Sequence, residues 1–157
     1  MEQTEALEIM LSGQSVILCG AGGSGKSFTL RKFIEQNRLL GRRTAVTATT
    51  GLAASHLNGQ TLHSWARVGL GKELPDDWQF TISKKKCKEF QTTATLVIDE
   101  VSMMPDFVFD MLDTVLRRAR NDDRPFGGIQ LILCGDFYQL PPVEGRFITN
   151  SKVWNGL

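Results

Sequence analysis

The stretch that decides the fold is Val16-Ile-Leu-Cys-Gly20-Ala-Gly-Gly-Ser-Gly25-Lys26-Ser27. Its last eight residues match the pattern G-x-x-x-x-G-K-[ST], with an apolar strand candidate before them and a helix candidate after them. Glycines let backbone amides surround phosphates, a lysine reaches the terminal phosphates, and the hydroxyl after it can ligate magnesium. The stretch therefore predicts a site for a nucleoside triphosphate with Mg²⁺, formed by Gly20, Ala21, Gly22, Gly23, Ser24, Gly25, Lys26 and Ser27.

Apolar runs followed by polar or glycine-rich segments recur along the chain. They predict buried strands at Val16–Cys19, Ala45–Thr47, Leu96–Ile98 and Ile129–Cys134. Helices are expected from about Ser27 to Leu40 and after Pro105, where apolar residues repeat at steps of three and four. Alternating strands and helices predict a doubly wound α/β fold with a parallel sheet, whose ligand lies beyond the carboxyl ends of the strands.

Composition indicates one ordinary folded domain. The 157 residues are 41% apolar and 22% charged, with 18 basic against 17 acidic side chains. No apolar run is long enough for a membrane span, and the first ten residues do not resemble a secretory or transit signal. We expect a soluble intracellular chain with reduced thiols, in which Cys19 and Cys134 lie in apolar runs as small buried hydrophobes.

Two further strand ends carry acids. Asp99 and Glu100 follow the third apolar run, where an acid of a phosphate-loop enzyme binds magnesium and its neighbour orients water. Asp136 and Gln139 follow the fourth run, although turn chemistry before Pro141 also accounts for them. Strands also become polar where they leave a core. The Asp99-Glu100 pair therefore indicates a functional site only because a phosphate loop precedes it in the chain. Together these residues predict convergence on one site.

At these residues the chain resembles the PIF-one (petite integration frequency) family of DNA helicases, in superfamily one, close to RecD-like and Dda-like enzymes. The resemblance covers nearly the whole chain. Its motifs are Gly20–Ser27, Thr47–Ala54, Gly59–Trp65, Asp99–Met103 and Gly135–Pro142, with Phe126–Gln130 also typical.

The resemblance implies a RecA-like phosphate-loop NTPase lobe, spanning residues 1–157, that hydrolyses ATP to move along single-stranded DNA from five-prime to three-prime. Lys26 and Ser27 would bind the phosphates and Mg²⁺, and Asp99 would complete the metal site. Glu100 would activate water, Gln139 would sense the terminal phosphate, and Gln3 would contact adenine.

The same resemblance implies a DNA-facing surface. Thr49, Thr50, Gly51 and Ser64 would hold DNA phosphates, while the rings of His63 and Trp65 would lie against bases. Without the motif, Trp65 reads as a core residue and His63 as an ordinary polar one. The run Lys84–Lys88 reads as a solvated helix face, and residues 69–77 read as a surface loop.

Two alternatives stay open from the residues alone. Another phosphate-loop enzyme, such as a kinase or GTPase, would need a lid or a guanine-reading segment, and neither is visible. A nucleotide-gated DNA-binding module without turnover is the second, although Lys26, Asp99, Glu100 and Gln139 are intact. The resemblance also implies a second RecA-like lobe as partner, so we expect a fragment that binds nucleotide but hydrolyses poorly. Its location would be the nucleus, mitochondrion or bacterial cytoplasm, with no membrane.

Overall fold

The computed structural model describes residues 3–20, 25–69 and 71–136. All strand pairs are parallel, and the sheet order is β1-β5-β4-β2-β3. The strands are β1 Val16–Cys19, β2 Thr44–Ala48, β3 Gln60–Thr61, β4 Thr95–Asp99 and β5 Gln130–Gly135. The predicted parallel α/β fold is confirmed, and four strands lie where the apolar runs placed them. The two residues of β3 are too few to show a periodicity, so the sequence does not reveal that strand.

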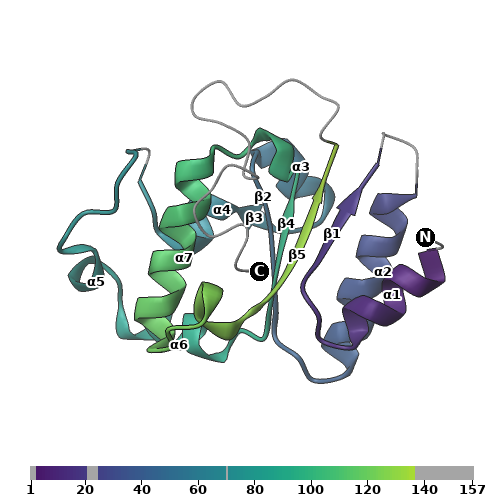
Figure 1. Cartoon of the computed structure of the whole chain (residues 1–157), viewed down its shortest axis with the longest axis horizontal. Coiled ribbons are helices and arrows are strands. Elements are labelled where there is room, and N and C mark those ends of the chain that lie inside the picture. The colour runs from purple at the N-terminus through teal and green to yellow at the C-terminus, as the bar shows by residue number, and fades with distance from the viewer. Residues whose placement is uncertain (1–2, 21–24, 70, 137–157) are drawn as a thin grey trace.

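Long helices cover both faces of the sheet. Figure 1 shows α1 and α2 on one face and α6 and α7 on the other. The helices are α1 Gln3–Leu11, α2 Lys26–Leu39, α3 Gly51–His56, α4 Leu62–Ala66, α5 Trp78–Thr81, α6 Lys84–Thr92 and α7 Asp106–Arg120. Two 3₁₀ turns, η1 Val101–Met103 and η2 Pro125–Gly128, precede α7 and β5. The helices expected after the phosphate loop and after Pro105 are α2 and α7.

Each face of the sheet has its own apolar core. On one face, Met10 of α1 and Leu30 and Phe33 of α2 pack against inward side chains of β2, β4 and β5. On the other face, the apolar stripe of α7 packs with Phe90 of α6 and Trp65 of α4 against β4 and β5. Burial on both faces explains why these strands read as continuous apolar runs rather than as alternating ones.

A buried polar network connects the amino ends of the central strands. The Gln130 amide nitrogen donates to the carbonyl oxygens of Met10 (2.7 Å) and Gln14 (2.8 Å), and its amide oxygen accepts from the Thr95 hydroxyl (2.8 Å). Asn37 of α2 donates to the hydroxyl oxygens of Thr44 (2.9 Å) and Thr95 (3.0 Å). The network fixes α1 and α2 relative to β2, β4 and β5, because each buried amide is satisfied only in this arrangement.

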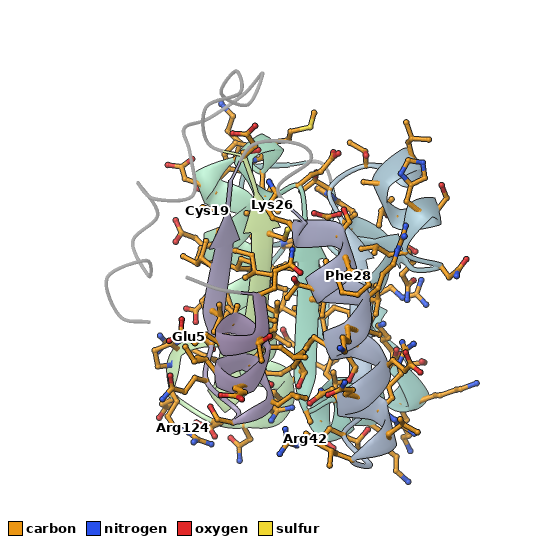
Figure 2. All side chains as sticks on the ribbon, turned by 90° about the vertical axis from the view of Figure 1, so that its right-hand side faces the viewer. Glu5, Cys19, Lys26, Phe28, Arg42 and Arg124 are labelled. Carbon is orange, nitrogen blue, oxygen red and sulfur yellow. The ribbon has the colours of Figure 1, made fainter. Side chains whose placement is uncertain are left out.

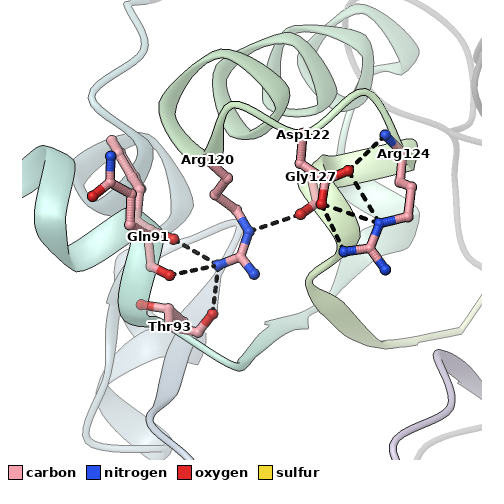
Figure 3. Close-up of polar contacts among 7 residues, drawn as sticks. Gln91, Thr93, Arg120, Asp122, Arg124 and Gly127 are labelled. Atoms are coloured by element: carbon pink, nitrogen blue, oxygen red, sulfur yellow. Dashed lines mark hydrogen bonds and ion pairs between the residues drawn. The ribbon is translucent and has the colours of Figure 1, made fainter.

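Arg120 fixes the turn before β5 (Figure 3). Its guanidinium donates to the carbonyl oxygens of Gly127 (2.9 Å), Phe90 (2.8 Å) and Thr93 (2.8 Å), while Arg124 pairs with Asp122 beside it. Gly127 has φ of +63°, and a Cβ there would lie 2.6 Å from the Leu116 carbonyl oxygen. The turn therefore needs a glycine, which gives the Phe126–Gln130 motif a structural reason.

The structure corrects two expectations about single side chains. Cys19 is exposed rather than buried, because alternate residues of the edge strand β1 face away from the helices, whereas Cys134 is buried. In the basic run, Lys84, Lys85 and Lys88 are exposed on α6, but Lys86 is only 6% exposed.

Two segment-level expectations also bear on the fold. Residue 69 and residues 71–77 belong to no helix or strand, as expected for a loop. Within the described ranges, no helix combines the length and apolarity needed to cross a bilayer.

Candidate nucleotide-binding and DNA-binding site

The phosphate loop joins the carboxyl end of β1 to the amino end of α2. Gly20 has φ of +150°, and Gly25, which caps α2, is left-handed with φ of +86°. Both glycines therefore permit backbone conformations that other residues adopt rarely. Ala21, Gly22, Gly23 and Ser24 lie outside the described residues. Ser27 is exposed in the first turn of α2, at the positive end of the helix.

Lys26 lies where two strands end. Its ammonium donates to the carbonyl oxygen of Gly20, after β1, and to that of Gly135 (3.3 Å), the last residue of β5. Figure 2 shows Lys26 and Cys19 at the same end of the sheet, opposite Arg42 and Arg124. A cation held by two carbonyl oxygens at this edge is positioned to meet an anionic group beyond the strands.

Asp99 and Glu100 form the acidic wall of the site. Asp99 is the last residue of β4, is half-buried, and accepts a 2.8 Å hydrogen bond from the Glu100 amide through Oδ1. Glu100 has φ of +56°, a conformation that costs a non-glycine residue free energy and that is found often at functional sites. The left-handed backbone of Glu100 ends the extended conformation of β4 directly after Asp99.

Cys134 shows how closely these charges gather. It lies opposite Asp99 in the ladder between β4 and β5. Burial and, after it, the negative charge of Asp99 raise the pKa of the Cys134 thiol to about 12, while the charge of Lys26 opposes the shift. The thiol is therefore neutral at physiological pH and adds no charge beside Asp99.

Gln3 reaches the phosphate loop. It is the first residue of α1, and its side-chain amide lies directly against Gly25, where a Cβ would collide with it. A residue that the sequence places far from the loop is thus next to it in space. The amide carries both a donor and an acceptor, which suits the edge of a purine base.

The remaining acidic motif is described only in part. Asp136 is half-buried just after β5, at the same edge of the sheet as Lys26 and Asp99. Gln139 lies outside the described residues.

The segment after β2 contacts the acidic wall. The Thr49 hydroxyl donates to the Glu100 carbonyl oxygen (3.0 Å), and the Thr49 amide donates to the Asp99 carbonyl oxygen (3.2 Å). The Thr49 hydroxyl hydrogen is therefore used inside the protein, and the residue links two motifs. Thr50 caps α3 by accepting from the Ala53 amide (3.2 Å), which leaves its own hydroxyl hydrogen available beside the exposed Gly51.

The segment around α4 divides between surface and core. Ser64 is exposed and His63 is half-buried, and burial lowers the pKa of the His63 imidazole. Trp65 is only 1% exposed and packs edge-to-face on Phe90, with ring centroids 5.0 Å apart. The expectation that the Trp65 ring lies against bases is wrong for this structure, because the ring faces the core side of α4.

The sequence alone does not predict the hydrogen bond from Thr49 to Glu100 or the close packing of Lys86 on Trp65. Neither has a local signal, since the partners lie 51 and 21 positions apart and meet only through the fold. The start of α1 did carry a signal, because Ala6, Leu7 and Met10 follow a helical spacing.

Known helicases resemble this chain in sequence. The sequence pattern of the PIF1-like helicases matches residues 2–156. The ATP-dependent DNA helicase Pif1 of Psychrobacter sp. is 43% identical over 152 residues, which cover 96% of this chain and 23% of that protein. The chain therefore spans about a quarter of the length of this curated relative.

Solved structures agree. The crystal structure of Pif1 helicase from Candida albicans superposes with a TM-score of 0.91 at 41% identity, covering 98% of this chain and 36% of that one. A Pif1 helicase from Bacteroides in complex with ADP-AlF₃ and single-stranded DNA superposes with a TM-score of 0.82 at 31% identity, covering 99% and 40%. Because the family pattern matches nearly the whole chain and these relatives share up to 43% of its residues, the chain belongs to the PIF1-like helicase family.

Proposed function

We propose that residues 1–157 form the first RecA-like motor lobe of an ATP-dependent DNA helicase. The observation that carries this proposal is the position of Lys26, held at the ends of β1 and β5 with Asp99 and Glu100 on the neighbouring strand. The Bacteroides Pif1 structure with ADP-AlF₃ and single-stranded DNA supports both ligands, because it is that of a family member with the same lobe.

ATP would bind at the carboxyl edge of the sheet. The residues present fit a triphosphate: Gly25 is left-handed at the start of α2, and the Lys26 ammonium lies beside the helix end. The Gln3 amide beside Gly25 would contact adenine. Ser27 and Asp99 would hold Mg²⁺, which would supply positive charge to offset that of the triphosphate.

Hydrolysis would depend on Glu100. Its carboxylate would accept a proton from the attacking water, and the Asp99 and Thr49 hydrogen bonds to its backbone fix its direction. Gln139 would sense the terminal phosphate. The Thr49 hydroxyl donates to the Glu100 carbonyl oxygen. A DNA contact next to Thr49 would therefore be linked to the general base Glu100 through a single hydrogen bond.

DNA would cross the α3 and α4 side of the same sheet edge. Thr50, Gly51, His63 and Ser64 offer hydroxyl, amide and ring groups that hold phosphates and sugars without reading sequence. Thr49 and Trp65 would support this DNA-facing surface from the interior of the protein.

The complete protein would need a second RecA-like lobe. The chain spans only 23% of the Psychrobacter helicase, so unwinding and five-prime to three-prime movement belong to a longer protein. Arginines from a second lobe can raise phosphoryl-transfer rates by about a thousandfold or more. We therefore propose that the lobe alone binds nucleotide but hydrolyses it slowly. The protein would act in the cellular compartment that contains its DNA substrate.

The proposal is tested on the two-lobe protein. Strand separation would be measured on duplexes with a five-prime or a three-prime single-stranded tail, with ATP and Mg²⁺. We expect unwinding of the five-prime-tailed substrate and none after Lys26→Ala, while Lys32→Ala, at an exposed position of the same helix, unwinds normally. Equal unwinding by Lys26→Ala would contradict the assignment of the site.

A further inference from the structure

The cluster that stands out beyond the nucleotide site surrounds a buried lysine. Lys86 of α6 is 6% exposed, and its ammonium lies 4.8 Å from the Trp65 ring centroid and 4.9 Å from that of Phe90. Glu89, one turn further on, pairs with it at 3.1 Å. A desolvated ammonium on two aromatic faces is held more firmly than a surface lysine, because both rings and the carboxylate stabilise its charge.

The aromatic partners belong to different helices. Trp65 lies in α4, Phe90 in α6, and Trp78, which starts α5, lies 6.2 Å from Phe90 between ring centroids. The Trp78 indole nitrogen also donates to the carbonyl oxygen of Arg67 (2.9 Å), the left-handed residue that ends α4. Lys86 therefore lies at the centre of a joint between α4, α5 and α6.

Helix α4 needs such a joint. It has five residues and follows a strand of two residues at the edge of the sheet, so neither element is stable by itself. Locally it is held by the Thr61 cap on the Ser64 amide (3.3 Å) and by the Ser64 hydroxyl bond to the Gln60 side chain (3.3 Å). Both bonds are exposed and compete with water, so the buried side chains of Leu62, Trp65 and Ala66 must fix the position of α4, and Trp65 is the largest of the three.

Trp65 is buried but borders a surface cavity. The cavity has a volume of about 250 Å³ and is lined also by Arg38, Arg43, Gln60 and Glu89. The indole nitrogen of Trp65 is buried and has no hydrogen-bond partner among the described residues. No hydrogen bond among the described residues therefore fixes the indole, whereas the Lys86 ammonium contacts its ring.

We propose that Lys86 is a positioning residue for DNA binding: by clamping Trp65 against Phe90, it holds α4 so that His63 and Ser64 face the bound single-stranded DNA. The inference rests on the proposed function, in which α4 contacts DNA. In this proposal Trp65 does not stack on a base. It is instead the residue through which α6 holds α4 in position to contact DNA. This role also separates Lys86 from its exposed neighbours Lys84, Lys85 and Lys88.

The test compares single-stranded DNA affinity across substitutions of Lys86. A fluorescein-labelled oligothymidylate is titrated with the two-lobe protein, and a fluorescent ATP analogue is titrated in parallel. We expect Lys86→Ala to weaken oligothymidylate binding about threefold to tenfold without changing affinity for the ATP analogue. Lys86→Arg should restore binding, because arginine also stacks on aromatic rings. Lys84→Ala, which removes the same charge from the exposed face of α6, should bind as the unaltered protein does.

Two further measurements separate positioning from a general loss of stability. Amide hydrogen exchange should accelerate at residues 62–66 in Lys86→Ala while α2 keeps its protection. In a double-mutant cycle, Trp65→Phe and Lys86→Ala should weaken DNA binding by less together than the product of their single effects, because both disturb one contact. The cycle can be run with Lys86→Met if the alanine variant does not fold.

The outcomes distinguish this inference from the proposed function. If His63→Ala and Ser64→Ala weaken DNA binding but Lys86→Ala does not, the positioning role is wrong and the DNA surface stands. If all three variants bind as tightly as the unaltered protein, α4 is not a DNA contact and both are wrong. Equal losses of DNA and nucleotide affinity in Lys86→Ala would also overturn the positioning role.

Discussion

Single residues at the carboxyl edge of the sheet are placed by neighbours that the sequence does not reveal. Lys26 is held by the Gly20 and Gly135 carbonyl oxygens, and Glu100 has a left-handed backbone. Thr49, expected to hold DNA phosphates, donates instead to the Glu100 carbonyl oxygen. The chemistry of the site therefore depends on backbone positions as much as on side-chain identity.

The role of Glu100 gives the first prediction. Glu100→Gln keeps the shape of the side chain but cannot accept a proton, so ATP binding should persist while hydrolysis by the two-lobe protein falls about a hundredfold or more. Single-turnover ATP hydrolysis measures the change. Glu73→Gln, in the exposed loop before α5, serves as control and should hydrolyse normally. Normal turnover by Glu100→Gln would remove it as the base.

The thiols give a second prediction. Burial and Asp99 raise the pKa of Cys134 to about 12, whereas Cys19 is exposed at the end of β1. Because the thiolate is the reactive form, iodoacetamide at about pH 8 should label Cys19 in the folded chain and Cys134 only after unfolding. Peptide mass spectrometry reads the result. Rapid labelling of Cys134 in the folded chain would show that the carboxyl ends of β4 and β5 are more open than described.

At the level of elements, buried polar side chains decide how helices meet the sheet. Asn37, Thr95 and Gln130 come from α2, β4 and β5, and together they connect the amino ends of the strands. Arg120 does the same for α6, α7 and the turn before β5 by donating to the carbonyl oxygens of Phe90, Gln91, Thr93 and Gly127. These contacts lie at the end of the sheet away from Lys26, so they support the site by fixing strand positions.

Gln130 allows this support to be measured. Gln130→Leu keeps the volume but leaves the Met10 and Gln14 carbonyl oxygens without their donor, and we expect a loss of about 2–4 kcal/mol of unfolding free energy. Urea unfolding measures the loss. Gln79→Leu, at an exposed position of α5, should change stability little. If the two variants were equally stable, the Gln130 network would not be the link between α1 and the sheet.

Over the whole molecule, local sequence patterns predict those elements whose structure depends on residues close together in the chain. The strands β1, β2, β4 and β5 and the helices α2 and α7 all have signals within a few residues, and each lies where expected. The positions of Gln3 against Gly25 and of Lys86 against Trp65 depend on segments far apart in the chain. Charge alone also misled, because the Lys84–Lys88 run contains three exposed lysines around one that belongs to the core.

The measurement that tests the central claim most directly is a titration of this chain with a fluorescent ATP analogue, followed by its ATPase rate with and without single-stranded DNA. Lys26→Ala and Lys32→Ala are run in parallel. We predict that the chain and Lys32→Ala bind the analogue in the presence of Mg²⁺, that Lys26→Ala does not, and that turnover is negligible even with DNA. Equal binding by Lys26→Ala would contradict the nucleotide site, and DNA-stimulated turnover would contradict the need for a second lobe.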